Sequence, residues 1–182
     1  FAALGLRAVL PPGPACDSLR TAARGGDSRR GALGGESGAS AGPSPCAASY
    51  LQPFAAHSAA MAHAGQDAAL PTQNVAALLP GSDPALRGQY VVIGAHFDHL
   101  GTSTEGALDP DARGAVRLGA DDNASGTAAV VELARIFSRH PARRSIIFVN
   151  FSGEEEGLLG SSYFVDHMPV ATDSVIAMLN FD

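Results

Sequence analysis

Hydrophobic and polar positions divide the chain into two parts with different patterns. Residues 1–46 are rich in Ala, Gly, Pro, Ser and Arg and offer few side chains that could form a core. Such a segment does not bury enough apolar surface to offset the entropy of ordering, so we expect a low-complexity, disordered leader. Residues 47–182 alternate apolar runs with amphipathic segments, which predicts one folded domain.

Apolar runs in the second part predict the strands of a sheet. Residues 90–95 and 145–151 are continuous runs with many β-branched side chains, which is typical of strands buried on both faces. A third apolar run covers residues 174–181. A shorter run at residues 74–79 ends in a turn cluster at residues 80–84, where prolines and a glycine interrupt any regular element.

Helical spacing of apolar positions predicts three helices between and before these strands. They cover residues 47–64, 123–140 and 158–168, and Pro141 ends the second of them. Strands that alternate with helices of this length indicate an α/β domain with a largely parallel central sheet.

Composition and charge exclude several classes of protein. The chain has 182 residues, of which 46% are hydrophobic, so one sizeable core is expected. Its two cysteines are too few for a disulfide-stabilised miniprotein or a zinc finger. No apolar run approaches the roughly 18–20 residues of a transmembrane helix. A net charge of −6 argues against a nucleic-acid partner, which would require a basic surface.

One histidine and several acidic side chains lie at the points where the predicted strands end. His96 and Asp98 follow the first buried strand, Glu154–Glu156 follow the second, and Asp182 follows the third. Asp121 and its neighbour come directly before the long helix. Because the carboxyl ends of parallel strands meet at one edge of a sheet, we expect these side chains to lie close together.

A cluster of carboxylates without lysine repels itself unless a cation neutralises it. One imidazole, several carboxylates and no thiolate suit zinc, with manganese or cobalt as alternatives. The pattern therefore predicts a divalent metal site at this edge of the sheet.

Each candidate has a simpler interpretation. His96 alone is an ordinary histidine at the rim of a sheet, but Asp98, on the same face of an extended chain, can accept its second imidazole N–H. Acids at a helix start favour the helix dipole, which accounts for Asp122 better than for Asp121. The Glu154–Glu156 run could be a solvated charge run, although it directly follows a buried strand.

Other chemistries fit the sequence less well. Ser125 and Ser152 are not part of a G-x-S-x-G turn, which argues against a serine hydrolase. His99, His140 and His167 are interpreted as surface residues.

Four motifs together carry a family resemblance. They span residues 94–101 (GAHFDHLG), 119–126 (GADDNASG), 153–161 (GEEEGLLGS) and 179–182 (LNFD). In this order and spacing they resemble the co-catalytic zinc aminopeptidases of metallopeptidase family twenty-eight, over residues 73–182. The resemblance implies a three-layer α/β/α zinc-exopeptidase fold, with residues 47–72 as a degraded leading helix.

The resemblance also implies a set of metal ligands. His96 and Asp182 would bind one zinc ion, Asp121 would bridge two ions, and Glu155 would bind the second. A further histidine ligand would come from a late loop beyond Asp182, so we expect a catalytic domain that is incomplete at its C-terminus.

Catalytic roles follow from the same resemblance. Glu154 would act as general base and then general acid, and Asp98 would orient His96. A cis peptide bond would join Asp121 to Asp122. The implied reaction is hydrolysis of N-terminal peptide bonds in peptides with a free N-terminus.

Alternatives remain open at this point. Carboxypeptidase or glutaminyl-cyclase chemistry uses the same scaffold, and a non-catalytic binding domain could retain a vestigial metal site. Family habit and the apolar residues 1–10 favour a secreted or periplasmic location. The sequence gives no oligomeric state and no preferred N-terminal residue.

Overall fold

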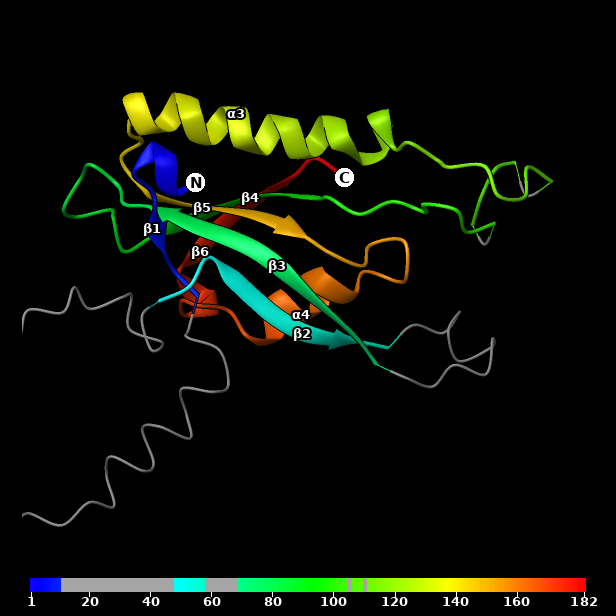
Figure 1. The fold of residues 1–182 in the computed structure, drawn as a ribbon. Coiled ribbons are helices and arrows are strands. Elements are labelled where there is room, and N and C mark those ends of the chain that lie inside the picture. The colour runs from blue at the N-terminus through cyan, green and yellow to red at the C-terminus, as the bar shows by residue number, and fades with distance from the viewer. Residues whose placement is uncertain (11–47, 58–68, 105, 110) are drawn as a thin grey trace, which may run out of the picture.

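A mixed six-stranded sheet forms the centre of the fold (Figure 1). The computed structural model describes residues 1–10, 48–57, 69–104, 106–109 and 111–182. The strand order is β1-β3-β5-β4-β6, and β2 pairs with β3 as well. The strands are β1 (Arg7–Ala8), β2 (Leu51–Ala56), β3 (Leu70–Leu79), β4 (Tyr90–His96), β5 (Ser145–Phe151) and β6 (Val175–Asn180).

Strand direction divides the sheet into two regions. Strand β4 runs parallel to both β5 and β6, whereas β3 is antiparallel to β1, β2 and β5. The α/β class is confirmed, but the sheet is mixed and not largely parallel: its parallel region is the group β5-β4-β6.

Helices cover both faces of the sheet. Helix α3 (Gly126–Arg139) lies on one face and the shorter α4 (Leu159–Asp166) lies on the other (Figure 1). Short helical turns are η1 (Ala2–Leu4) and η3 (Thr172–Ser174). The segment η2 (Ala120–Ser125), directly before α3, contains two residues with non-helical backbone angles. The expected three-layer arrangement is therefore confirmed. In the described part of the chain, no helix is both long and apolar enough to cross a bilayer.

The core consists of one apolar cluster on each face of the sheet. All seven residues of β5 are buried, as expected for a central strand with helices on both sides. Val130 and Ala134 of α3 pack against Phe148 on one face. On the other face, the ring of Phe164 in α4 meets the edge of Phe151, with centroids 5.7 Å apart. This packing fixes β5, whose end carries the acidic motif.

The helix predicted for residues 47–64 is wrong over its described part. Residues 51–56 form strand β2, in which Gln52 and Phe54 are buried and the residues on either side of each are more exposed. This alternation has the period of a strand, and pairing with β3 outweighs the helical spacing of the apolar side chains. Residues 58–64 lie outside the described residues. Within the described residues of 47–72, the implied leading helix is likewise replaced by β2 and the start of β3.

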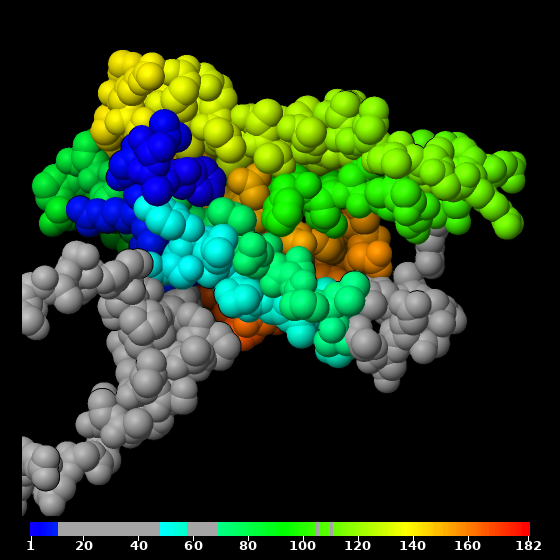
Figure 2. Space-filling view, viewed as in Figure 1, coloured from blue at the N-terminus to red at the C-terminus, as the bar shows by residue number. Residues whose placement is uncertain are grey.

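The expectation of a leader without packed structure does not hold for residues 1–10. Strand β1 pairs with β3, and Leu6 and Leu10 are buried. The hydroxyl of Tyr50 donates to the carbonyl of Leu6 at 2.6 Å. Figure 2 shows these first residues between helix α3 and the segment that contains β2. Residues 11–46 lie outside the described residues.

A buried amide connects the antiparallel strands to the segment after β5. Asn74 of β3 is fully buried and donates to Gln52 Oε1 at 2.9 Å and to the Gly160 carbonyl at 2.8 Å. Its Oδ1 accepts from the backbone N–H of Ser152 at 3.1 Å. Gly160 leaves room for this contact, since a Cβ there would lie 2.4 Å from Asn74 Oδ1. The Asn74 side chain thereby holds both ends of the loop that carries Glu154.

Truncating this amide should destabilise the protein. We expect Asn74→Ala to lower the free energy of unfolding by about 1–3 kcal/mol, because buried donors and acceptors lose their partners. Urea unfolding followed by circular dichroism measures the change. Gln73→Ala removes an exposed amide from the neighbouring position of β3 and should change stability by less than about 0.5 kcal/mol. Equal losses in both variants would contradict this role of Asn74.

Candidate metal centre

Three strand ends meet where the acidic motifs lie. Strand β4 ends at His96, and the N–H of Phe97 still donates to the Phe151 carbonyl at 2.9 Å. On the other side of β4, the N–H of Phe181 donates to the Gly94 carbonyl at 2.9 Å. These bonds hold the residues that follow β4, β5 and β6 at one edge of the sheet, as predicted from the parallel strands.

His96 is buried and faces a different acceptor with each ring nitrogen. Its Nδ1 donates to the backbone carbonyl of Asp98 at 3.1 Å and lies 3.7 Å from the Asp98 carboxylate. Because a carbonyl oxygen only accepts, Nδ1 carries a hydrogen, and Nε2 of a neutral ring presents a lone pair. That Nε2 lies 3.2 Å from Oδ1 of Asp122. Two electron-rich atoms at this distance need a proton or a metal cation between them.

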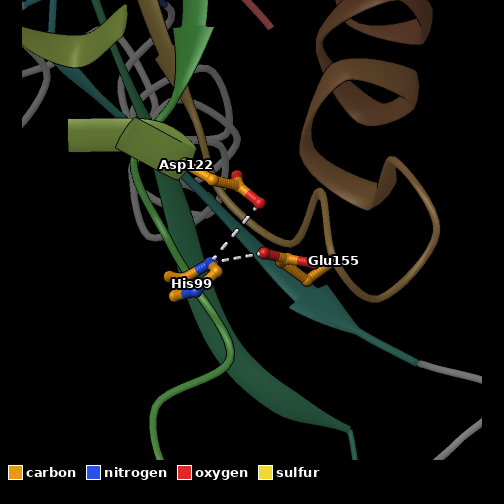
Figure 3. Close-up of side chains that lie close together, drawn as sticks. All are labelled: His99, Asp122 and Glu155. Carbon is orange, nitrogen blue, oxygen red and sulfur yellow. Dashed lines mark hydrogen bonds and ion pairs between the residues drawn. The ribbon is translucent and has the colours of Figure 1, made fainter. Parts of the chain in front are cut away.

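A second group of ligand atoms lies beside the first. Nδ1 of His99 lies 2.6 Å from Oε1 of Glu155 and 3.9 Å from Oδ2 of Asp122 (Figure 3). One ligand atom from each of these three residues falls within 4.8 Å of the others. Imidazole nitrogen and carboxylate oxygen are the donors that zinc accepts in proteins, so the group fits a divalent cation.

Glu154 stands at the wall of a cavity of about 300 Å³. His96 and Asp182 line the same cavity. The backbone N–H of Glu154 donates to the Asp98 carboxylate at 3.4 Å. Burial raises the pKa of the Glu154 carboxyl above its ordinary value, and the nearby carboxylates, including Glu155, raise it further, while a positive charge on His96 opposes them.

The structure brings Asp122, and not Asp121, to the two histidines. The backbone carbonyl of Asp121 accepts from the Ser125 hydroxyl at 2.7 Å. The helix-dipole explanation of Asp122 does not apply, because Asp122 has φ −112° and ψ 92°, outside the helical region, and helix α3 begins only at Gly126. The cis peptide bond also lies one residue later than the resemblance implied, between Asp122 and Asn123.

Asn123 connects this turn to the end of β6. Its Oδ1 accepts from the Gly126 N–H at 2.9 Å, and its Nδ2 donates to the Phe181 carbonyl at 3.2 Å. The segment before α3 and the segment that ends in Asp182 are therefore held together by one side chain.

Other predicted positions are arranged as follows. Asp98 lies beside His96, and Glu155 lies beside His99 and Asp122. His99 is not the surface residue that the sequence indicated: its side chain is 21% exposed and it faces two carboxylates. The signal available in the sequence was its position three residues after His96, directly after a buried strand.

Comparison with known proteins shows the family of the chain. The sequence matches peptidase family M28 over residues 74–182, which is more than half of its length. The chain belongs to this family. The match contains all four motifs that carried the resemblance, and the α/β fold agrees with it.

Named relatives of this M28 chain include peptidases from fungi and bacteria. A probable zinc metalloprotease of Pyrenophora tritici-repentis is 38% identical over 111 residues, which cover 61% of this chain and 24% of the relative. Aminopeptidase YwaD of Bacillus subtilis is 50% identical over 50 residues, which cover 28% of this chain and 11% of the relative.

A solved structure shows the same fold. A Zn-dependent exopeptidase from Parabacteroides distasonis has a TM-score of 0.58 and 19% identity, covering 72% of this chain and 46% of that one. This likeness concerns the fold alone. The M28 chain spans about a quarter of the length of the curated relatives that match it first.

The raised pKa of Glu154 predicts how stability depends on pH. In chelator-treated protein, the folded state favours the protonated carboxyl, so Glu154 stabilises the fold most below its ordinary pKa of 4.5 and loses this contribution as pH rises through the raised folded value. Glu154→Gln mimics the protonated form. We expect it to unfold at a higher temperature than the wild type at pH 7 and at the same temperature near pH 4.

Thermal unfolding at both pH values measures this difference. Glu156→Gln alters the exposed neighbour and should leave the unfolding temperature unchanged at either pH. A Glu154→Gln variant that is less stable than the wild type at pH 7 would show that the fold stabilises the carboxylate, which is the opposite of a raised pKa.

Proposed function

We propose that this M28 chain carries the metal-binding and proton-transfer groups of a zinc aminopeptidase, which hydrolyses N-terminal peptide bonds. One observation carries the proposal: Nε2 of buried His96 and Oδ1 of Asp122 face each other at 3.2 Å, a geometry that a shared cation satisfies. The zinc metalloprotease and aminopeptidase names of the relatives support the same metal and reaction.

Five side chains would hold two zinc ions or act beside them. His96 and Asp182 would bind the first ion, and Glu155 the second. Asp122 would bridge the two, in place of the predicted Asp121, because its two carboxylate oxygens face different imidazoles. Asp98 would keep His96 in the tautomer with Nδ1 protonated, through the contact with its backbone carbonyl.

Bound divalent cations supply Lewis-acid polarisation of a carbonyl and lower the pKa of a water molecule. The proton transfers belong to Glu154. With a raised pKa, its carboxylate can take a proton from the attacking water and then give it to the leaving amine. Glu154 lines the same cavity as His96, which supports this role.

The choice of an aminopeptidase over a carboxypeptidase is supported by the named relatives. One of them is an aminopeptidase of Bacillus subtilis, 50% identical over 50 residues. The carboxylates at the site do not decide this choice, because bound divalent cations would neutralise them.

Activity of the zinc-loaded chain tests the role of Glu154. Leucine p-nitroanilide is the substrate, and N-acetyl-leucine p-nitroanilide is its blocked counterpart. We expect hydrolysis of the free-amine substrate only. Glu154→Gln should lower kcat by about 10²–10⁴-fold, because general acid–base catalysis contributes this much, while bound zinc stays unchanged.

Glu156→Gln is the matched control. It removes the charge of an exposed carboxylate two residues after Glu154, in the same acidic run. It should retain wild-type kcat. Equal cleavage of the acetylated substrate would contradict the aminopeptidase assignment. Full activity in Glu154→Gln would contradict the general-base role, and an inactive zinc-loaded wild type would contradict catalysis by this chain.

A further inference from the structure

The start of helix α3 and the turn before it bond to the ends of all three parallel strands. Asn123 donates to the Phe181 carbonyl, at the end of β6. The Thr127 hydroxyl donates to the carbonyl of His96, the last residue of β4, at 2.9 Å. Asn150 of β5 donates through Nδ2 to Oγ1 of Thr127 at 3.4 Å. Thr127 therefore contacts the backbone of a proposed zinc ligand.

Hydrogen-bonding capacity fixes the orientation of the Thr127 hydroxyl. A backbone carbonyl only accepts, so the bond to His96 takes the hydroxyl hydrogen. Oγ1 then offers its lone pairs to a donor, which the amide of Asn150 supplies. Asn150 is 6% exposed and His96 is 2% exposed, so these bonds are largely shielded from water and costly to lose.

We propose that Thr127, oriented by Asn150, is a positioning residue for the metal ligand His96. The inference rests on the proposed zinc site, in which His96 binds the first ion. The peptide group between His96 and Phe97 is bound on both sides: its carbonyl accepts from Thr127 at 2.9 Å, and its N–H donates to the Phe151 carbonyl at 2.9 Å. Rotation of this peptide group would break both bonds.

The orientation of this peptide group affects the zinc-binding nitrogen through the residues that follow. The Asp98 carbonyl accepts from Nδ1 of His96 at 3.1 Å, which leaves the lone pair on Nε2. That Nε2 lies 3.2 Å from Oδ1 of Asp122. Because residues 96–98 form one short segment, rotation of the peptide after His96 would move the Asp98 carbonyl away from the ring. Thr127 therefore acts on the metal site through the backbone.

Close packing of the helix start brings Thr127 within reach of β4. The N–H of Gly126 donates to Oδ1 of Asn123 at 2.9 Å. A Cβ at Gly126 would overlap with the Phe181 carbonyl oxygen and with the Asn123 amide. The helix can lie this close to the strand ends because residue 126 has no side chain.

A second contact joins the same two segments independently of Thr127. The N–H of Arg117 donates to the Gly101 carbonyl at 2.7 Å, in an antiparallel bridge that closes residues 101–117 into a loop, which we call the Arg117 loop. The Arg117 guanidinium also donates to the Asp109 carboxylate at 2.9 Å and to the Ser103 carbonyl at 2.8 Å. Removing the Thr127 hydroxyl should therefore release one peptide group and leave the fold intact.

Zinc affinity of Thr127 variants tests the proposal. Thr127→Val keeps the shape of the side chain but removes the hydroxyl. We expect the zinc site that is lost in His96→Ala to be weakened by about 10–100-fold in Thr127→Val, as for other residues that orient a metal ligand. Thr127→Ser retains the hydroxyl and should bind zinc as the wild type does. Titration of the full chain against a competing chromogenic chelator measures each affinity.

Ser138→Ala is the matched control. Ser138 also lies in α3, is partly buried, and donates from its hydroxyl to a backbone carbonyl, that of Arg135, at 2.8 Å. It lies near the other end of the helix, so its loss should leave zinc binding unchanged. An equal loss of zinc affinity in Ser138→Ala and Thr127→Val would show a general effect of helix stability and contradict the proposal.

Hydrogen exchange in chelator-treated protein reports on the peptide group directly. The Phe97 N–H should exchange about tenfold faster in Thr127→Val than in the wild type, because its peptide group loses one of two bonds. N–H groups in the middle of α3 should keep their rates. Uniform acceleration of exchange across the fold would show loss of global stability and overturn the positioning role.

Asn150→Ala tests the same contact from the other side and does not depend on the folding of Thr127→Val. Without the amide, the Thr127 hydroxyl is free to rotate, so zinc affinity should fall, by less than in Thr127→Val. The double variant should bind zinc as weakly as Thr127→Val alone, because both changes remove one shared interaction. Undiminished affinity in Asn150→Ala, or losses that add in the double variant, would contradict the proposal.

The outcomes separate this inference from the proposed function. Undiminished zinc binding in Thr127→Val overturns the positioning role, as does a Thr127→Ser variant that binds as weakly as Thr127→Val. In either case, zinc that is bound by the wild type and lost in His96→Ala leaves the proposed function standing. A wild-type chain that takes up no zinc would overturn both.

Discussion

The buried side chain of Asn74 is the contact on which the arrangement of the site depends. It accepts from one end of the acidic loop, at Ser152, and donates to the other end, at Gly160. Both bonds are shielded from water, so they are stronger than exposed bonds and costly to lose. Strand β3 is antiparallel to β5, and Asn74 links β3 to the loop after β5, which carries two of the candidate site residues.

Electrostatic repulsion explains why the site is built from so many rigid parts. Carboxylates from the ends of β5 and β6 and from the turn before α3 meet at one edge, where their charges oppose assembly. Backbone bonds between strands, the Asn123 bridge and the Arg117 loop hold these groups near one another. The apolar core thus supplies the free energy that keeps a charged cluster in place before any cation binds.

Sequence patterns predicted the parallel region of the sheet well, because β4 and β5 are continuous apolar runs buried on both faces. The helix predicted before them is wrong. The apolar side chains near Phe54 fit the period of a helix as well as that of a strand, and pairing with β3 selects the strand. Asp121 and Asp122 differ by a single position, and their roles depend on backbone angles that the sequence does not specify. The sequence indicates a surface position for His99, because Gly119, which packs against its ring, is distant along the chain.

The antiparallel bridge between Gly101 and Arg117 joins the segment after β4 to the segment before α3. The Arg117 side chain also donates to Asp109 and to the Ser103 carbonyl, so a change at Asp109 reaches the backbone on both sides of the bridge. Variation within this loop is therefore constrained at the residues that Arg117 contacts and freer at exposed positions such as Leu108.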